Sequence, residues 1–245
     1  IDYAEKKGIK LTVTKEKIYS RDQNLWHISH EGGDIEQLEN EHNEEVLYMM
    51  VTPPERAKDT PTYVDITFEK GWPVKVDGES LSPATLLQKL NKIAGENGVG
   101  VADIVENRIV GMKSRGIYET PGGTLLMESL MELETIVFDK DTLNFKKLVS
   151  QKYAEIAYNG QWFTPIKYAL DAFVDSIDEV LTGTIKLKLY KGHIKIAGRF
   201  TENALYDEGI SSFGSSELYS HKDAEGFIKL FSLPNTIRAY KKLSK

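Results

Sequence analysis

The strictest pattern in the sequence is the alternation of apolar and polar residues between Thr184 and Phe200. In its first half, isoleucine and leucine alternate with lysine and tyrosine, a period of two that is typical of a strand with one buried and one wet face. Lys191, Gly192 and His193 then provide a turn, and a second alternating run follows. This segment predicts an antiparallel β-hairpin whose lysines lie on the solvent side of a sheet.

Helical periodicity recurs in four segments between residue 83 and this hairpin. Ser82 is a good N-cap, Pro83 suits the first helical position, and apolar residues at three- to four-residue spacing predict a helix over 83–96. Three further apolar stripes predict helices, which run from just after Pro121–Gly123 to about 138, from Asp141 to about 158, and from Thr164–Pro165 to about 181. Such stripes are far more typical of core packing than of cofactor binding.

The remaining regular segments complete the predicted fold. Tyr63–Phe68 and Pro73–Val76 predict two strands joined at the Lys70–Gly71 turn, and residues 9–13 predict a short strand. The fold class is therefore α+β, with a mixed, largely antiparallel sheet of hairpins that is covered by helices and followed by a C-terminal helical arm.

Both ends of the chain are predicted to be helical. Residues 1–8 have the pattern of a helix end, because good helix formers precede Gly8. We expect this helix to belong to a larger preceding domain, residues 9–221 to form the main domain, and residues 222–245 to form a C-terminal helical arm. The arm is helical on both sides of Pro234, and its apolar stripe must pack on its own core or on a neighbour.

The composition excludes several classes of protein. The 245 residues carry a formal net charge of −6, which argues against a nucleic-acid partner because such proteins favour a basic face. No cysteine is present, so disulfides, zinc–thiolate sites and thiol catalysis are excluded, and a cytoplasmic location is expected. No apolar run is long enough to span a bilayer, so no membrane partner is expected.

The stretch Asp103–Thr124 concentrates the polar groups that a binding site needs. Its charged and hydrogen-bonding residues are Glu106, Asn107, Arg108, Lys113, Ser114, Arg115, Tyr118 and Glu119. We expect them to lie on a turn between rigid elements rather than on an ordinary core strand. The residue types favour a polar ligand that is zwitterionic or anionic, and the stretch closes with a Thr-Pro-Gly-Gly turn before the next helix.

Residues 19–33 form a second candidate segment. An apolar–polar alternation around Ile28, ended by a double glycine, by itself predicts an edge strand followed by a loop. His27 and His30 lie three residues apart without acids in helical register, so structural roles are favoured and no metal site is expected. The acidic run over residues 34–45 favours a solvated surface segment.

Three long motifs resemble the argininosuccinate synthase family. ENRIVGMKSRGIYETPGGT resembles a signature of that family, and YSRDQNLWHISHEGG and TGTIKLKLYKGHIKIAGR resemble an earlier segment and a later hairpin, in the same order. The family's nucleotide-binding loop, SGGLDTS, does not occur in the sequence, and residues 127–130 and 201–204 depart from the family's pattern. The resemblance therefore implies the C-terminal synthetase and oligomerisation part of the enzyme without its N-terminal nucleotide-binding domain, whose last helix would end at residues 1–8.

The resemblance also implies a reaction, the ATP-dependent ligation of citrulline and aspartate in arginine biosynthesis. The ureido oxygen of citrulline attacks the α-phosphate of ATP, citrullyl-adenylate forms and pyrophosphate leaves, and the aspartate amine then displaces AMP to give argininosuccinate. ATP and Mg²⁺ would be bound mainly by the nucleotide-binding domain, with no prosthetic group, and a homotetramer would assemble through the C-terminal helix. The chain alone is expected to be inactive, and the alternative is a non-catalytic assembly or ligand-binding fragment.

Carried over to this sequence, the resemblance implies four citrulline-binding residues, which are Ser20, Ser29, Glu106 and Tyr118. The Glu106 carboxylate would pair with an α-ammonium group, and the Tyr118 ring would line the aliphatic stem. Lys113 and Arg115 stay open between phosphate or substrate-carboxylate contacts and internal ion pairs. No catalytic residue is assigned, because the residues that bind triphosphate and aspartate are expected on the nucleotide-binding domain.

Overall fold

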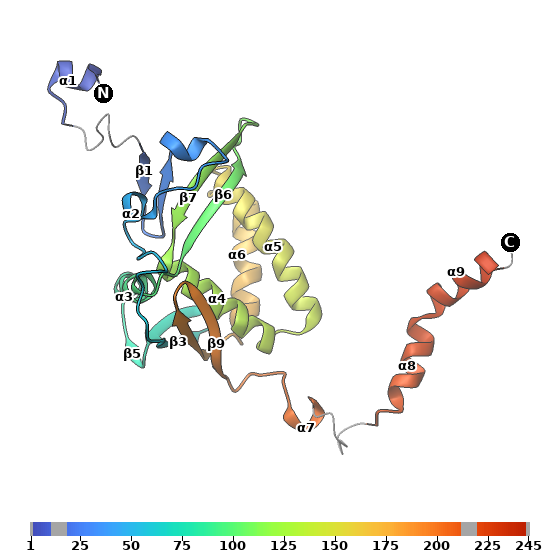
Figure 1. Cartoon of the computed structure of the whole chain (residues 1–245). Coiled ribbons are helices and arrows are strands. Elements are labelled where there is room, and N and C mark those ends of the chain that lie inside the picture. Colours follow the sequence, from blue (N-terminus) through green and yellow to red (C-terminus); the bar gives the residue numbers. More distant parts are fainter. Residues whose placement is uncertain (1, 11–18, 212–219, 244–245) are drawn as a thin grey trace. The chain divides into compact units, whose positions relative to one another are not determined.

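The fold is α+β, as predicted. Figure 1 shows the computed structural model, which describes residues 2–10, 19–211 and 220–243. The chain divides into two compact units, Ile1–Asn203 and Ala204–Lys245, which are described separately below. Within the described residues of the first unit, all strand pairs are antiparallel and form two sheets.

The first sheet, here called the site sheet, has the strand order β1–β2–β7–β6. Its strands are β1 (Ser20–Gln23), β2 (Ile28–Glu31), β6 (Val101–Asn107) and β7 (Lys113–Glu119). Both candidate segments of the sequence are therefore hairpins that pair side by side through β2 and β7. Two expectations are wrong: β2 is internal rather than an edge strand, and most polar residues of the central stretch lie on strands rather than on a turn. A strand with one open face carries polar side chains at every second position. A polar stretch is therefore compatible with a strand as well as with a turn.

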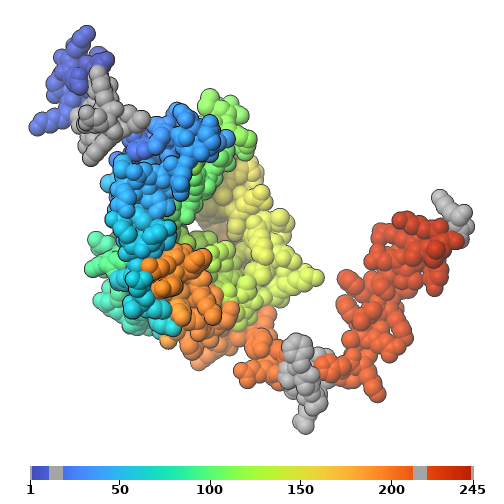
Figure 2. Space-filling model, viewed as in Figure 1, coloured from blue at the N-terminus to red at the C-terminus, as the bar shows by residue number. Residues whose placement is uncertain are grey.

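The segment after β2 covers one face of the site sheet. It contains the short helices η1 (Gly33–Glu36) and α2 (Glu44–Leu47). Ile35 and Leu47 are fully buried and cluster with Ile117 of β7. The acidic segment is therefore anchored by apolar residues and is not only the solvated surface segment that its charge predicted. In the space-filling view, this blue segment and the green β6–β7 hairpin form one continuous surface (Figure 2).

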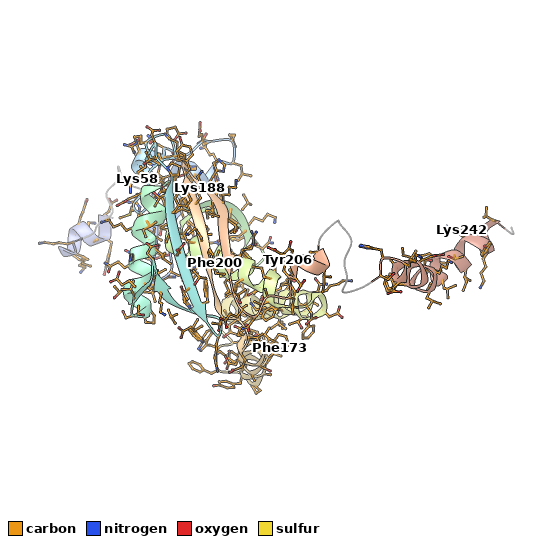
Figure 3. The ribbon with its side chains drawn as sticks, turned by 90° about the horizontal axis from the view of Figure 1, so that it is seen from below. Lys58, Phe173, Lys188, Phe200, Tyr206 and Lys242 are labelled. Atoms are coloured by element: carbon orange, nitrogen blue, oxygen red, sulfur yellow. The ribbon has the colours of Figure 1, made fainter. Side chains whose placement is uncertain are left out.

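The second sheet, here called the core sheet, has the order β5–β4–β3–β8–β9. Its strands are β3 (Thr62–Glu69), β4 (Trp72–Val76), β5 (Glu79–Ser80), β8 (Gly183–Tyr190) and β9 (His193–Phe200). The predicted β8–β9 hairpin is confirmed, and β8 also pairs with the distant β3. Lys186 and Lys188 lie on the face away from the core, and Lys188 and Phe200 sit on neighbouring strands (Figure 3).

Two helices pack on the inner face of the core sheet, namely α3 (Pro83–Glu96) and α4 (Pro121–Val137). The Ser82 hydroxyl accepts a hydrogen bond from the Thr85 N–H, as a helix cap does. Between sheet and helices lies the main core, which includes Val64, Ile66, Phe68, Leu86, Leu90, Leu125, Leu133, Ile185, Leu187 and Leu189. The predicted helices at 83–96 and after Pro121 are confirmed.

The double glycine after Pro121 is part of α4 rather than a turn before it. Gly122 donates its N–H to the Asn91 side chain on α3 at 2.8 Å. A Cβ at Gly122 would lie 2.8 Å from the Asn91 backbone nitrogen, so only glycine allows the two helices to approach this closely.

The next two predicted helices are α5 (Lys140–Tyr158) and α6 (Pro165–Asp178). Helix α6 ends at Asp178, three residues before the predicted end, and leads into β8. The predicted loop over residues 201–221 contains one short helix, α7 (Glu208–Ser211), among the residues that the structure describes.

The terminal helices follow their predictions. Helix α1 (Asp2–Lys7) is followed by Gly8, whose φ of 63° is the left-handed conformation that favours glycine. The predicted strand over 9–13 lies mostly outside the described residues. In the second unit, α8 (Asp223–Phe231) and α9 (Leu233–Leu243) have no buried residues. The helices in the described part of the chain include none that is long and apolar enough to cross a membrane.

Candidate functional site

The strand register brings all four predicted citrulline residues to one face of the site sheet. Ser29 on β2 lies directly opposite Tyr118 on β7, and Glu106 on β6 lies opposite Ser114 on the same strand as Tyr118. Ser20 is two strand positions from Asp22, which pairs with Ser29. Because side chains two residues apart on a strand point to the same side, these four residues share one face, here called the ligand face.

Tyr118 and Glu106 are already hydrogen-bonded. The Tyr118 hydroxyl donates to Glu106 Oε1 at 2.6 Å. Burial and the Glu106 carboxylate both raise the pKa of Tyr118, so the phenol stays protonated and remains a donor. The Tyr118 ring lies over Gly116, where a Cβ would come within 3.0 Å of it, and its centroid is 5.6 Å from that of His27.

The two serines differ in depth. Ser29 is 5% exposed, and its hydroxyl donates a 3.4 Å hydrogen bond to the backbone carbonyl of Asp22. Ser20 is exposed on the edge strand β1, opposite Glu31. The ligand face therefore offers one buried and one accessible hydroxyl, each able to donate or accept.

An arginine at the tip of the β6–β7 hairpin adds a positive charge to the ligand face. Arg108 Nη2 lies 2.5 Å from Glu31 Oε2, and Arg108 Nε donates to Ser114 Oγ at 3.0 Å. Arg108 is one of the polar residues of the central stretch, whereas Glu31 lies in a matched motif but was not predicted as a site residue. With Arg108 and Glu106 the face holds both signs of charge, which suits a zwitterion.

Lys113 and Arg115 lie on the opposite face of the site sheet. Arg115 forms a bidentate pair with Asp103, at 2.9 and 2.6 Å, and its Nη1 also donates to the backbone carbonyls of Ile35, Gln37 and Asn40. This hydrogen bonding holds the pKa of the Asp103 carboxyl below its usual range. Lys113 Nζ donates to Asn107 Oδ1 at 2.8 Å. Arg115 therefore forms an internal ion pair, one of the two alternatives left open by the sequence, and a contact of Lys113 or Arg115 with phosphate or a substrate carboxylate stays a prediction.

Glu119 is a residue whose importance sequence reasoning missed. It is fully buried, and its carboxylate accepts hydrogen bonds from the N–H groups of Met49, Met50 and Val51 and lies 2.8 Å from His30 Nε2. Burial raises the pKa of Glu119, but the bonds from His30 and the three backbone groups more than offset it, so the net pKa is lowered. The structural role predicted for His30 is confirmed. In the described part of the chain, no group of three or more His, Cys, Asp or Glu residues is placed to hold a metal ion.

Comparison with known proteins places this sequence in a family. The sequence model described as "Arginosuccinate synthase C-terminal domain" matches residues 19–238. The chain belongs to the argininosuccinate synthase family. The resemblance seen in the three motifs is thereby confirmed, and the matched range includes every strand of the site sheet.

Individual relatives support the same family assignment. The argininosuccinate synthase of Clostridium acetobutylicum is 63% identical over 245 residues, which cover 100% of this chain and 61% of that protein. The argininosuccinate synthase of Clostridium botulinum strain Langeland is 65% identical over 241 residues, covering 98% of this chain and 60% of that protein. The chain therefore spans about 60% of the length of the curated relatives that it matches.

Proposed function

We propose that this chain supplies the citrulline-binding surface of an argininosuccinate synthase. The observation that carries the proposal is the gathering of Ser20, Ser29, Glu106 and Tyr118 on one face of the site sheet, from four different strands. The reaction is the ATP-dependent ligation of citrulline and aspartate through citrullyl-adenylate, with release of pyrophosphate and then AMP. Because the ureido carbon of citrulline is a poor electrophile, adenylation provides the leaving group that the aspartate amine displaces.

The ligand face matches the chemistry of an amino acid. The Glu106 carboxylate pairs with the α-ammonium group in a charge-assisted hydrogen bond. The Tyr118 hydroxyl keeps Glu106 in place, and its ring supports the aliphatic stem of citrulline. The serine hydroxyls bind the carboxylate or the ureido group. These residues contribute mainly by positioning the substrate for adenylation.

The other substrates require a nucleotide-binding domain. In the proposed enzyme that domain binds ATP and Mg²⁺ and supplies the aspartate-binding residues, and the complete protein acts in the cytoplasm. The second unit of this chain supports a homotetramer: α8 and α9 expose large apolar side chains, which a neighbouring copy would cover.

A second candidate function is a ligand-binding and assembly module without turnover of its own. This candidate is supported by the exposed apolar side chains of α8 and α9, which suit assembly with a neighbouring copy. The two candidates share the citrulline surface and differ in whether the chain takes part in a complete catalytic site.

The first test measures citrulline binding to the chain by titration calorimetry. Glu106→Gln removes the charge that faces the α-ammonium group, so we expect the dissociation constant to rise about 10- to 100-fold, the size of a lost hydrogen bond to a charged group. Glu69→Gln, on the core sheet, is the matched control and should change it less than twofold. Equal affinities for the wild type and Glu106→Gln would contradict the assigned surface.

The second test separates the two functions. Pyrophosphate release is measured with ATP, Mg²⁺, citrulline and aspartate, omitting each amino acid in turn. We expect no release from the chain alone and release that needs both amino acids once a separately made nucleotide-binding domain of a relative is added. Citrulline binding without any reconstituted release would favour the assembly module instead.

A further inference from the structure

We propose that Arg21, His30 and Glu119 act as a positioning relay on the face of the site sheet opposite the ligand face. The inference rests on the proposed function, because it concerns how the same citrulline surface is held in place. None of the three side chains lies on the ligand face, so they are positioning residues and not catalytic ones.

The hydrogen bonds of the relay fix the tautomer of His30. Arg21 Nε donates to His30 Nδ1 at 3.0 Å, and an arginine nitrogen is always a donor. His30 Nδ1 is therefore the acceptor, and His30 Nε2 carries the proton that it donates to Glu119 at 2.8 Å. The three residues come from β1, β2 and β7, so the relay runs across three neighbouring strands.

The far end of the relay fastens the site sheet to the segment before the core sheet. Glu119 Oε1 accepts from the Met49 N–H, and Oε2 accepts from the N–H groups of Met50 and Val51, all at 2.7–2.8 Å. The next residue, Thr52, donates its N–H to the carbonyl of Gly95 on α3 at 2.9 Å. Through residues 49–52, the buried carboxylate connects the site sheet to a helix of the main core.

Each relay residue adjoins a proposed citrulline residue in the chain. The three adjacent pairs are Ser20–Arg21, Ser29–His30 and Tyr118–Glu119. Consecutive residues of a strand point to opposite faces, so a hydrogen bond that fixes one side chain also fixes the backbone from which its neighbour projects. A displacement of about 1 Å at a substrate-positioning group can cost on the order of 100-fold in rate, so this backbone control matters for the ligand face.

The first variant to test is Glu119→Gln. It keeps the shape of the side chain but replaces one accepting oxygen with an NH₂ group, which cannot accept from a backbone N–H or from His30. The matched control is Glu134→Gln, because Glu134 is also a buried carboxylate (7% exposed) but pairs with Lys146 away from the site sheet. We expect both variants to lower the urea concentration at the unfolding midpoint by a similar amount. The citrulline dissociation constant should rise at least tenfold for Glu119→Gln and less than twofold for Glu134→Gln.

A second measurement does not depend on citrulline. The ¹³Cζ chemical shift of Tyr118, assigned with Tyr118→Phe, reports its hydrogen bond to Glu106 in the free protein. We expect Glu119→Gln to move this signal toward that of a solvent-exposed tyrosine and Glu134→Gln to leave it in place. If the wild type fails to bind citrulline, the proposed function is refuted. The ¹³Cζ signal still decides whether Glu119 positions Tyr118.

Arg21→Gln provides a second test of the relay if Glu119→Gln fails to fold. Arg21 is only half-buried, so its loss removes the outer end of the relay without emptying the core. We expect a rise of about threefold in the citrulline dissociation constant and a smaller ¹³Cζ shift, with Arg199→Gln on β9 as the control. The relay is overturned if the relay variants and their controls affect Tyr118 and citrulline binding equally.

Discussion

Tyr118 and Glu106 are joined by a 2.6 Å hydrogen bond although they are not opposite each other in the strand register. Tyr118 pairs with Ala102, and Glu106 pairs with Ser114, so the phenol reaches along the sheet over Gly116. The glycine leaves room for the ring, and the ring holds the carboxylate. The part of the proposed site that binds an α-ammonium group is therefore formed before any substrate arrives.

Tyr118→Phe tests the importance of this bond. The variant removes the donor that orients Glu106, and we expect the citrulline dissociation constant to rise about tenfold, equivalent to about 1.4 kcal/mol. The free energy of unfolding should fall by about 1 kcal/mol, because the bond is only partly shielded from water. Calorimetry and urea denaturation measure the two effects. Tyr63→Phe on the core sheet is the control, and an equal change in that variant would argue against a specific role.

Gly116→Ala tests the space below the Tyr118 ring. A Cβ there lies 3.0 Å from the ring, so the ring must tilt and lengthen its bond to Glu106. Gly198→Ala is a close match, because Gly198 on β9 stands two residues before Phe200 and its Cβ would lie 2.9 Å from that ring. We expect both variants to lower the unfolding midpoint and only Gly116→Ala to weaken citrulline binding, about five- to tenfold. Similar binding in the two variants would contradict this account.

Asp178 makes stability depend on pH. Burial raises the pKa of its carboxyl from 3.8 to about 6; Lys146 opposes the shift, whereas Glu134 and Asp175 add to it. The folded state therefore holds this proton over a range in which the unfolded chain releases it, and the contribution of Asp178 to the free energy of unfolding falls as pH rises from about 4 to about 6.

Asp178→Asn should remove this pH dependence. After allowing for partial exposure of the group to solvent, we expect a free energy of unfolding about 1 kcal/mol above that of the wild type at pH 7.5 and little difference at pH 4.5. Urea denaturation at the two pH values measures this difference in free energy of unfolding. Glu155→Gln, on the exposed side of α5, is the control. A constant difference between variant and wild type at both pH values would contradict the assignment.

Gly122→Ala tests the close approach of α4 to α3. The added methyl group meets the Asn91 backbone nitrogen at 2.8 Å and the Leu87 carbonyl at 3.0 Å, which cannot rotate away. Such overpacking typically costs about 1–3 kcal/mol, measured as the free energy of unfolding. Gly226→Ala in α8 has open space around its Cβ, so its free energy of unfolding should not fall. A Gly122→Ala variant as stable as the wild type would show that the helices can separate freely.

Local sequence signals predicted most of the individual elements. The hairpin over Thr184–Phe200 and the helix over 83–96 have patterns in which period, cap and turn residues agree, so their bounds in the structure follow closely. The helices after Pro121 also follow from their apolar stripes. Local patterns are ambiguous where polar residues have two explanations: the central stretch has the polarity of a turn but forms two strands, and β2 has the pattern of an edge strand but is internal.

The family, the α+β class and the residue types at the proposed citrulline site follow from local patterns and long motifs in the sequence. Which residues share a face depends instead on contacts between segments far apart in the chain. The antiparallel pairing of β2 with β7 joins segments about ninety residues apart, and it sends Tyr118 to the ligand face and Glu119 to the buried face. No local signal distinguishes these two neighbours, since strand alternation becomes meaningful only once a partner strand fixes which side is covered.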